Sequence, residues 1–164
     1  MIEIERFDGE KIKINKDNCF GCELIKNSYV NSGLVYESEN FTISQDFELP
    51  ILGMLIIASK RHVNSFTELT QVERLECMEL ISKTLKILKE NNICQTYSII
   101  QEEKSHFHIW LLPNHSYMLK NFGNPVKNIS KIFQDSLKNL KNKETIDKIY
   151  DSLNLIKSKF NERI

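Results

Sequence analysis

Residues 105–113 read Ser-His-Phe-His-Ile-Trp-Leu-Leu-Pro, an apolar run that holds two of the four histidines of the chain. Residues two apart in a strand project from the same face, so we expect His106, His108 and Trp110 to share one face. The alternating residues are large and apolar and should form the buried face: Phe107, Ile109 and Leu111. Two imidazoles opposite a buried face indicate a functional site, although a histidine pair on an exposed edge strand would by itself mean little.

The composition indicates a water-soluble protein with a core of ordinary size. The chain has 164 residues, of which 41% are hydrophobic and 27% charged, and this allows a single domain with an appendage. Its 22 basic and 22 acidic side chains balance, so the chain as a whole does not attract nucleic acid or an acidic membrane. No apolar run has the length of a membrane span, and residues 1–14 do not resemble a signal peptide. We expect a cytoplasmic protein that binds neither nucleic acid nor membranes.

Hydrophobic periodicity predicts an α+β fold with an antiparallel sheet of about five or more strands. Thr70-Gln71-Val72-Glu73 fits a capping box and predicts a long helix that ends near Asn91. Asp8-Gly9 predicts a hairpin that is a candidate for the same sheet. The predicted strands are 34–37, 41–45, 54–58, 96–101 and 106–112, the last two joined by a turn at 102–104.

After Pro113 the sequence becomes rich in Lys and Asn and predicts two helices. One opens at Asn124-Pro125, where proline suits the first turn, and the other covers residues 145–160. We therefore expect residues 1–118 to form the domain that carries the site. Residues 119–164 should form a helical extension packed on it.

Cys19 and Cys22 form a CxxC pair, which outside a secreted protein indicates metal binding or redox chemistry. A thioredoxin-like redox pair should open a helix directly after a strand, whereas a polar segment precedes this pair, which favours a metal. Gly21 between them should allow a tight turn that directs both sulfurs to one point. The other two cysteines, Cys77 and Cys94, are interpreted as buried small residues.

Two stretches together resemble the histidine triad (HIT) family of nucleotide hydrolases and transferases. Residues 106–113 follow the family signature of three alternating histidines and a later proline, with Trp110 in the third histidine's place. Residues 46–62, DFELPILGMLIIASKRH, follow the family layout D-x6-G-H-x-L-V-x-P-K-x-H without a gap. The sequence departs from that layout at Met54, where the family has histidine, and at Ser59, where proline is usual.

The resemblance implies a role for each matching residue. The middle histidine, His108, would attack the α-phosphorus of a nucleotide and form a nucleotidyl-histidine intermediate. Asp46 falls where the family's acidic residue holds the ribose hydroxyls. Without the third histidine, Gln101 and Ser105 are the nearest candidates to donate to the phosphoryl oxygens, and Trp110 is a candidate to contact the substrate.

Bacterial HIT proteins with an N-terminal CxxC bind zinc through its cysteines, the histidine of the K-x-H segment and the first triad histidine. The matching residues here are Cys19, Cys22, His62 and His106. The resemblance thus implies a structural zinc ion that joins the N-terminal segment to the catalytic strand.

The leading interpretation is a nucleotide phosphohydrolase that acts at the α-phosphate of a dinucleoside polyphosphate, such as diadenosine tetraphosphate, or of a nucleoside phosphoramidate. A nucleotidyltransferase of the same family is an alternative. A catalytically reduced, zinc-containing nucleotide-binding protein is another, because Met54 and Trp110 replace family histidines. Many HIT proteins are dimers, so a homodimer is a further expectation.

Overall fold

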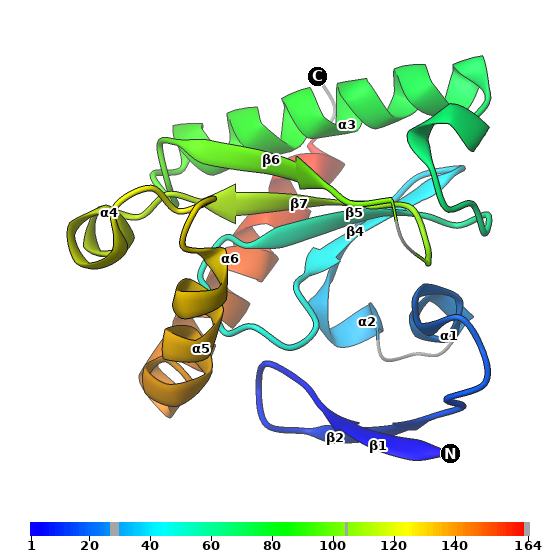
Figure 1. Cartoon of the computed structure of the whole chain (residues 1–164). Coiled ribbons are helices and arrows are strands. Elements are labelled where there is room, and N and C mark those ends of the chain that lie inside the picture. Colours follow the sequence, from blue (N-terminus) through cyan, green and yellow to red (C-terminus); the bar gives the residue numbers. More distant parts are fainter. Residues whose placement is uncertain (27–29, 104, 163–164) are drawn as a thin grey trace.

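The computed structural model describes residues 1–26, 30–103 and 105–162, and its centre is a five-stranded sheet (Figure 1). The strands of this sheet are β3 (Leu34–Glu37), β4 (Phe41–Gln45), β5 (Leu55–Ser59), β6 (Tyr97–Gln101) and β7 (His108–Pro113). They lie in the order β3-β4-β5-β7-β6, and every neighbouring pair is antiparallel. The predicted α+β fold with a five-stranded antiparallel sheet is confirmed.

The N-terminal hairpin forms a sheet of its own, so its assignment to the main sheet is wrong. Its strands, β1 (Ile2–Glu5) and β2 (Lys11–Ile14), pair only with each other. The hairpin lies across one face of the main sheet, below it in Figure 1. It is held there by a backbone bond from Phe7 N to Phe47 O of 2.7 Å. The buried Arg6 also donates to the Tyr150 hydroxyl at 3.3 Å, which ties the hairpin to the C-terminal part of the chain.

The helices follow the sequence closely where capping signals are strong. They are α1 (Phe20–Lys26), α2 (Val30–Gly33), η1 (Phe66–Glu68), α3 (Gln71–Glu90), α4 (Ser116–Phe122), α5 (Ile129–Asn139) and α6 (Lys143–Asn161). The capping box of α3 is present, because Thr70 accepts from Glu73 N and the Glu73 side chain accepts from Thr70 N. Among the described residues, no helix combines the length and the apolar character needed to cross a membrane.

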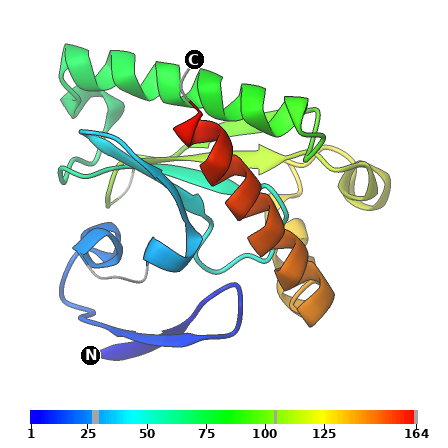
Figure 2. The same cartoon turned by 180° about the vertical axis from the view of Figure 1, so that it is seen from behind.

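The two faces of the sheet have different surroundings. Helices α3 and α6 lie against one face, and α6 crosses it obliquely in the view from behind (Figure 2). That face holds the main apolar core, to which α6 contributes Ile149, Leu153, Ile156 and Phe160. The cross-strand pair Ala58 and His108 belongs to the other face, which the N-terminal hairpin and α1 approach. The alternation predicted for residues 106–112 thus separates core from site.

Several elements differ from prediction. The strand expected from His106 begins at His108, because the backbone N–H of Phe107 instead donates to Val63 O at 2.6 Å. The helix expected at Asn124-Pro125 begins at Ile129, since the Asn124 side chain accepts from Lys127 N and stabilises a turn there. Helix α4 was not predicted. The predicted turn at 102–104 includes one residue, number 104, that lies outside the described residues.

Replacing Thr70 with alanine should lower the free energy of unfolding by about 1 kcal/mol, because the N–H of Glu73 would lose its side-chain acceptor. Urea unfolding of the two proteins measures the difference. Thr70→Ser keeps the hydroxyl and serves as the control, with stability close to that of the wild type. A Thr70→Ala protein as stable as Thr70→Ser would contradict the capping role.

Candidate functional site

Cys19, Cys22, His62 and His106 meet at one end of the sheet, although they come from distant parts of the sequence. One candidate ligand atom from each lies within 4.8 Å of all the others. Cys22 Sγ is 3.3 Å from His62 Nδ1 and 3.5 Å from His106 Nδ1. A tetrahedral zinc ion with bonds of about 2.0–2.3 Å separates its ligand atoms by roughly 3.3–3.8 Å. The donor types and spacings therefore fit a single ion in a Cys₂His₂ site.

The imidazole of His106 makes close contacts through both of its ring nitrogens. Its Nδ1 faces the cysteine sulfurs, and its Nε2 lies 2.6 Å from the backbone carbonyl of Ser59, which accepts the ring proton. A carbonyl in this position fixes the ring and its tautomer, as partners of metal-ligating histidines commonly do. Burial lowers the pKa of His106, which favours the neutral ring that a metal ligand must have.

Gly21 is needed for close approach and not for a tight turn, so the reason predicted for it is wrong. It lies inside α1, with Cys19 directly before this helix and Cys22 within it. A Cβ atom on Gly21 would be 2.6 Å from Cγ of His106, which is far too close. The absence of a side chain at Gly21 thus allows Cys19 and Cys22 to lie close to the histidine ring.

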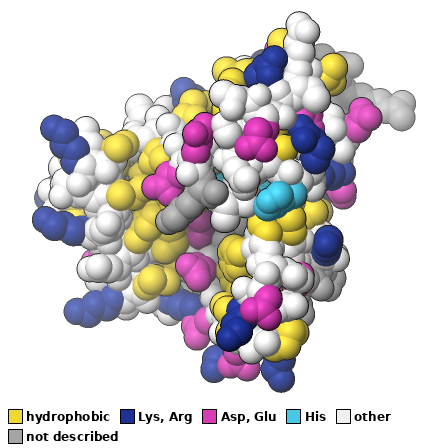
Figure 3. Space-filling view, turned by 45° about the vertical axis from the view of Figure 1, so that its right-hand side comes forward, with side chains coloured by type: hydrophobic (Ala, Val, Ile, Leu, Met, Phe, Trp, Pro, Cys, Tyr) yellow, Lys and Arg dark blue, Asp and Glu magenta, His cyan; other side chains and the backbone are white. Residues whose placement is uncertain are grey.

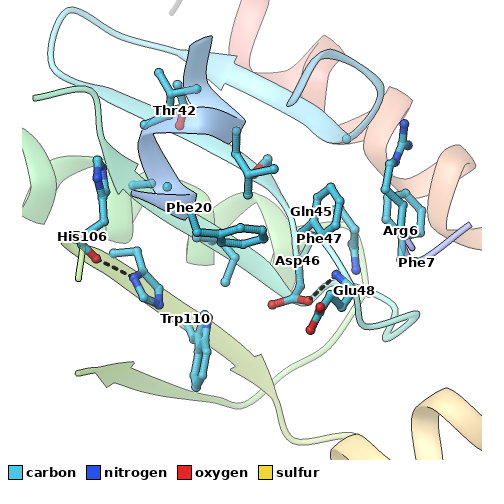
Figure 4. A pocket seen from close by; sticks show the side chains of 18 of the residues that line it. Arg6, Phe7, Phe20, Thr42, Gln45, Asp46, Phe47, Glu48, His106 and Trp110 are labelled. Carbon is cyan, nitrogen blue, oxygen red and sulfur yellow. Dashed lines mark hydrogen bonds between the residues drawn. The ribbon is translucent and has the colours of Figure 1, made fainter. Parts of the chain in front are cut away.

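His108 follows on the same stretch of chain and faces a cavity. Its Nδ1 lies 2.8 Å from the backbone carbonyl of His106, the bond drawn between the two histidines in Figure 4. Because a carbonyl only accepts, Nδ1 carries a proton, and in the neutral ring the lone pair is therefore on Nε2. No hydrogen bond to Nε2 from a described residue is present. The ring is therefore oriented with its basic nitrogen free.

The cavity has a volume of about 320 Å³ and lies over the sheet face that His108 and Trp110 share. Much of its wall is apolar: Phe20 and Phe47 both line it and contact each other edge to face, with ring centroids 5.8 Å apart. Apolar and acidic side chains gather around the hollow of this face in Figure 3. A largely apolar cavity with a few polar groups is typical of a small-molecule site.

Asp46 lies in the wall of the cavity and is 8% exposed. Its Oδ1 accepts from the backbone N–H groups of Glu48 at 3.0 Å and Leu49 at 2.9 Å. Burial raises its pKa to about 6, and the two backbone hydrogen bonds oppose this rise. At neutral pH the carboxylate is therefore mainly ionised and able to accept from a ligand.

The remaining predicted residues are divided between the two faces. Trp110 and Ser105 line the cavity, and the Trp110 ring centroid is 5.5 Å from that of His108. Trp110 also packs edge to face on Phe133 of α5, at 5.7 Å. Gln101, in contrast, pairs with Ile109 across β6 and β7 and shares its face, opposite His108. It does not line the cavity, and we leave it out of the site.

Several cavity residues were missed by sequence reasoning. Phe7 and Arg6 reach the cavity only because the hairpin folds over it, and no local signal indicates this. Phe20 lies between the two metal-site cysteines, and Gln45 directly precedes Asp46, so both were near residues already singled out.

No protein-family model matches the chain, and no curated protein sequence does either. Solved structures do match. A HIT-like protein of Bartonella henselae involved in cell-cycle regulation is 16% identical, with a TM-score of 0.54, over 78% of this chain and 98% of that one. A zinc-bound HIT family protein of Mycobacterium smegmatis is 17% identical, with a TM-score of 0.51, over 77% and 97%.

The third similar structure is the diadenosine triphosphate hydrolase of Plasmodium falciparum. It is 14% identical, with a TM-score of 0.52, over 80% of this chain and 78% of that one. At such low identity these likenesses show the fold, and they agree with one another. The chain has the fold of the histidine triad proteins, as the resemblance in sequence implied.

The raised pKa of Asp46 predicts a pH-dependent contribution to stability. An acid that titrates near 4 in the unfolded chain and about 6 in the fold stabilises the fold at low pH. This contribution is complete below about pH 4 and is lost as the pH rises through 6. Asp46→Asn keeps the acceptor for the two backbone N–H groups but cannot titrate.

Relative to Asp46→Asn, the wild type should therefore lose about 2–3 kcal/mol of unfolding free energy between pH 4 and pH 7. Urea unfolding of both proteins across this range is the measurement. The variant corrects for all other titrating groups. A difference between the two proteins that does not change with pH would show that Asp46 titrates normally.

Proposed function

We propose that the cavity binds a nucleotide and that His108 catalyses a displacement at its α-phosphorus. In the first step Nε2 forms a bond to phosphorus, while the bond from phosphorus to the leaving group breaks and that group takes the electron pair. In the second step water attacks phosphorus, the bond from phosphorus to Nε2 breaks with its electron pair returning to that nitrogen, and the proton lost by the water passes to solvent. The observation that carries the proposal is the 2.8 Å bond from Nδ1 to the His106 carbonyl, which selects the tautomer whose nucleophilic nitrogen is Nε2.

The other residues of the cavity support binding of a nucleotide whose α-phosphate lies at His108. An ionised Asp46 can accept from two neighbouring ribose hydroxyls through the oxygen atoms it presents to the cavity. The aromatic walls formed by Phe20 and Phe47 suit a flat nucleobase. Ser105, which is exposed and lines the cavity, is the candidate donor to the phosphoryl oxygens.

We further infer that the Cys₂His₂ cluster binds zinc. Two thiolates and two imidazoles are a donor set that structural zinc sites use, and four protein ligands leave no position for a reacting water. The proposed role is structural, because the ion would join α1, the loop after β5 and the start of β7. That connection would fix the position of the His106 carbonyl and hence the His108 ring.

The substrate we favour is a dinucleoside polyphosphate, such as diadenosine tetraphosphate, or a nucleoside phosphoramidate. A nucleotidyltransferase would use the same residues with a phosphorylated acceptor in place of water. A nucleotide-binding protein with reduced activity is supported by Trp110, which is held by Phe133 and offers only an indole N–H beside His108. Membership of the HIT family, a cytoplasmic location and a homodimer remain predictions.

Replacing a ligand of the proposed zinc site should lower both the zinc content and the stability of the protein. Purified without added metal, the wild type should contain about one zinc per chain by elemental analysis. His106→Ala should contain much less and should unfold at a lower temperature, because metal binding is coupled to folding. His108→Ala is the matched control and should keep its zinc. A metal-free wild type with a Cys19–Cys22 disulfide would contradict the zinc site.

The nucleophile can be tested directly by trapping the intermediate. Wild-type protein mixed with a fluorogenic adenosine phosphoramidate and quenched in base should carry an adenylyl group on His108, seen by peptide mass spectrometry. His108→Ala should form no adduct and lose at least about 10³-fold in turnover, since the covalent route disappears.

The control is the zinc content of His108→Ala, which must match that of the wild type. Equal turnover by wild type and His108→Ala would refute the nucleophile. Tight binding of AMP by calorimetry, with no turnover and no adduct, would instead support the nucleotide-binding protein.

A further inference from the structure

Glu102 lies next to His108 at the edge of the sheet. The antiparallel pairing of β6 with β7 ends at Gln101 and Ile109. Glu102 follows Gln101, and His108 precedes Ile109, so Glu102 and His108 lie opposite each other where the pairing ends. Residues opposite each other in antiparallel strands project from the same face, with Cβ atoms about 4.5–5.5 Å apart. Both residues line the cavity, which agrees with this placement.

The carboxylate of Glu102 is accessible to a ligand. The residue is exposed, and its side chain has no hydrogen bond or ion pair with another described residue. The next residue, Glu103, has a different environment, because its Oε1 accepts from the Ser65 hydroxyl at 2.6 Å. Glu103 does not line the cavity. Of these two adjacent glutamates, Glu102 is therefore the one that can act at the site.

Glu102 and Asp46 lie on opposite sides of His108. Asp46 directly follows β4, Glu102 directly follows the edge strand β6, and β7 with His108 lies between these strands in the sheet. A nucleotide whose ribose is held by Asp46 therefore reaches His108 from the side of β4. The side toward Glu102 is left for the leaving group and for the water that replaces it, since attacking and leaving groups at phosphorus lie roughly in line.

We propose that Glu102 is the general base of the second step, in which water releases the nucleotide from His108. The carboxylate takes a proton from the water while the water oxygen forms its bond to phosphorus. The electron pair of the bond from phosphorus to Nε2 returns to His108, and Glu102 then gives the proton to solvent. A positioned carboxylate in this role typically contributes about 10²–10⁴-fold to the rate. This inference rests on the proposed function and adds to it the residue that activates the water.

The Glu102→Gln variant should complete the first step and then stop at the adduct. With the fluorogenic adenosine phosphoramidate it should release about one fluorophore per chain in a rapid burst. Later turnovers should be about 10²–10⁴-fold slower than those of the wild type, and the adenylyl group should accumulate on His108 in peptide mass spectrometry. Turnover at the wild-type rate would overturn the proposal. Slow turnover with neither burst nor adduct would also overturn it, because the variant would then be impaired in the first step.

Azide distinguishes a missing base from a distorted site. Azide attacks phosphorus without losing a proton, so it should discharge the adduct of Glu102→Gln at least as fast as that of the wild type. A much slower discharge in the variant would overturn the proposal.

Glu103→Gln is the matched control and should turn over like the wild type, because the Glu103 carboxylate is bonded to Ser65 away from the cavity. An equal loss of turnover in Glu102→Gln and Glu103→Gln would contradict a specific role for Glu102. If the wild type itself forms no adduct and turns over no substrate, the proposed function is wrong and this inference falls with it.

Discussion

The whole site depends on the contacts that hold the side chain of His106 in place. Its ring lies between two cysteine sulfurs and the Ser59 carbonyl, and its own backbone carbonyl orients His108. His106 thus connects the Cys₂His₂ cluster, through its side chain, with His108, through its backbone carbonyl. Because β7 begins at His108, the position of this residue is set by the pairing of β7 with β5 and by the bond from its ring to the His106 carbonyl. Gly21 makes this arrangement possible by leaving room for the imidazole.

The C-terminal helices affect the site as well as the core. Helix α6 completes the main core on one face of the sheet, while Phe133 of α5 supports Trp110 on the other. The residue that replaces the third triad histidine is therefore part of a packed aromatic contact and not an isolated substitution. An aromatic wall at this position makes one side of the surroundings of His108 apolar.

The sequence was informative wherever local chemistry determines structure. The strands 34–37 and 41–45 and the capped start of α3 formed as predicted, and the four metal-site candidates do lie together. Features set by distant contacts were not predictable: Arg6 donates to Tyr150, which is far away in the sequence, and the hairpin forms a sheet of its own. Gln101 was chosen for its nearness in sequence, but cross-strand register places it on the wrong face.

The central claim is that the His106 carbonyl holds His108 with Nδ1 protonated and Nε2 free. Nitrogen-15 NMR of the histidine rings, with His108 assigned by comparison with His108→Ala, reports this tautomer directly. At a pH where the ring is neutral, the account predicts a proton on Nδ1 and an unprotonated Nε2. A ring found mainly with its proton on Nε2 would contradict the account, because the nitrogen that faces the substrate would then have no lone pair to attack phosphorus.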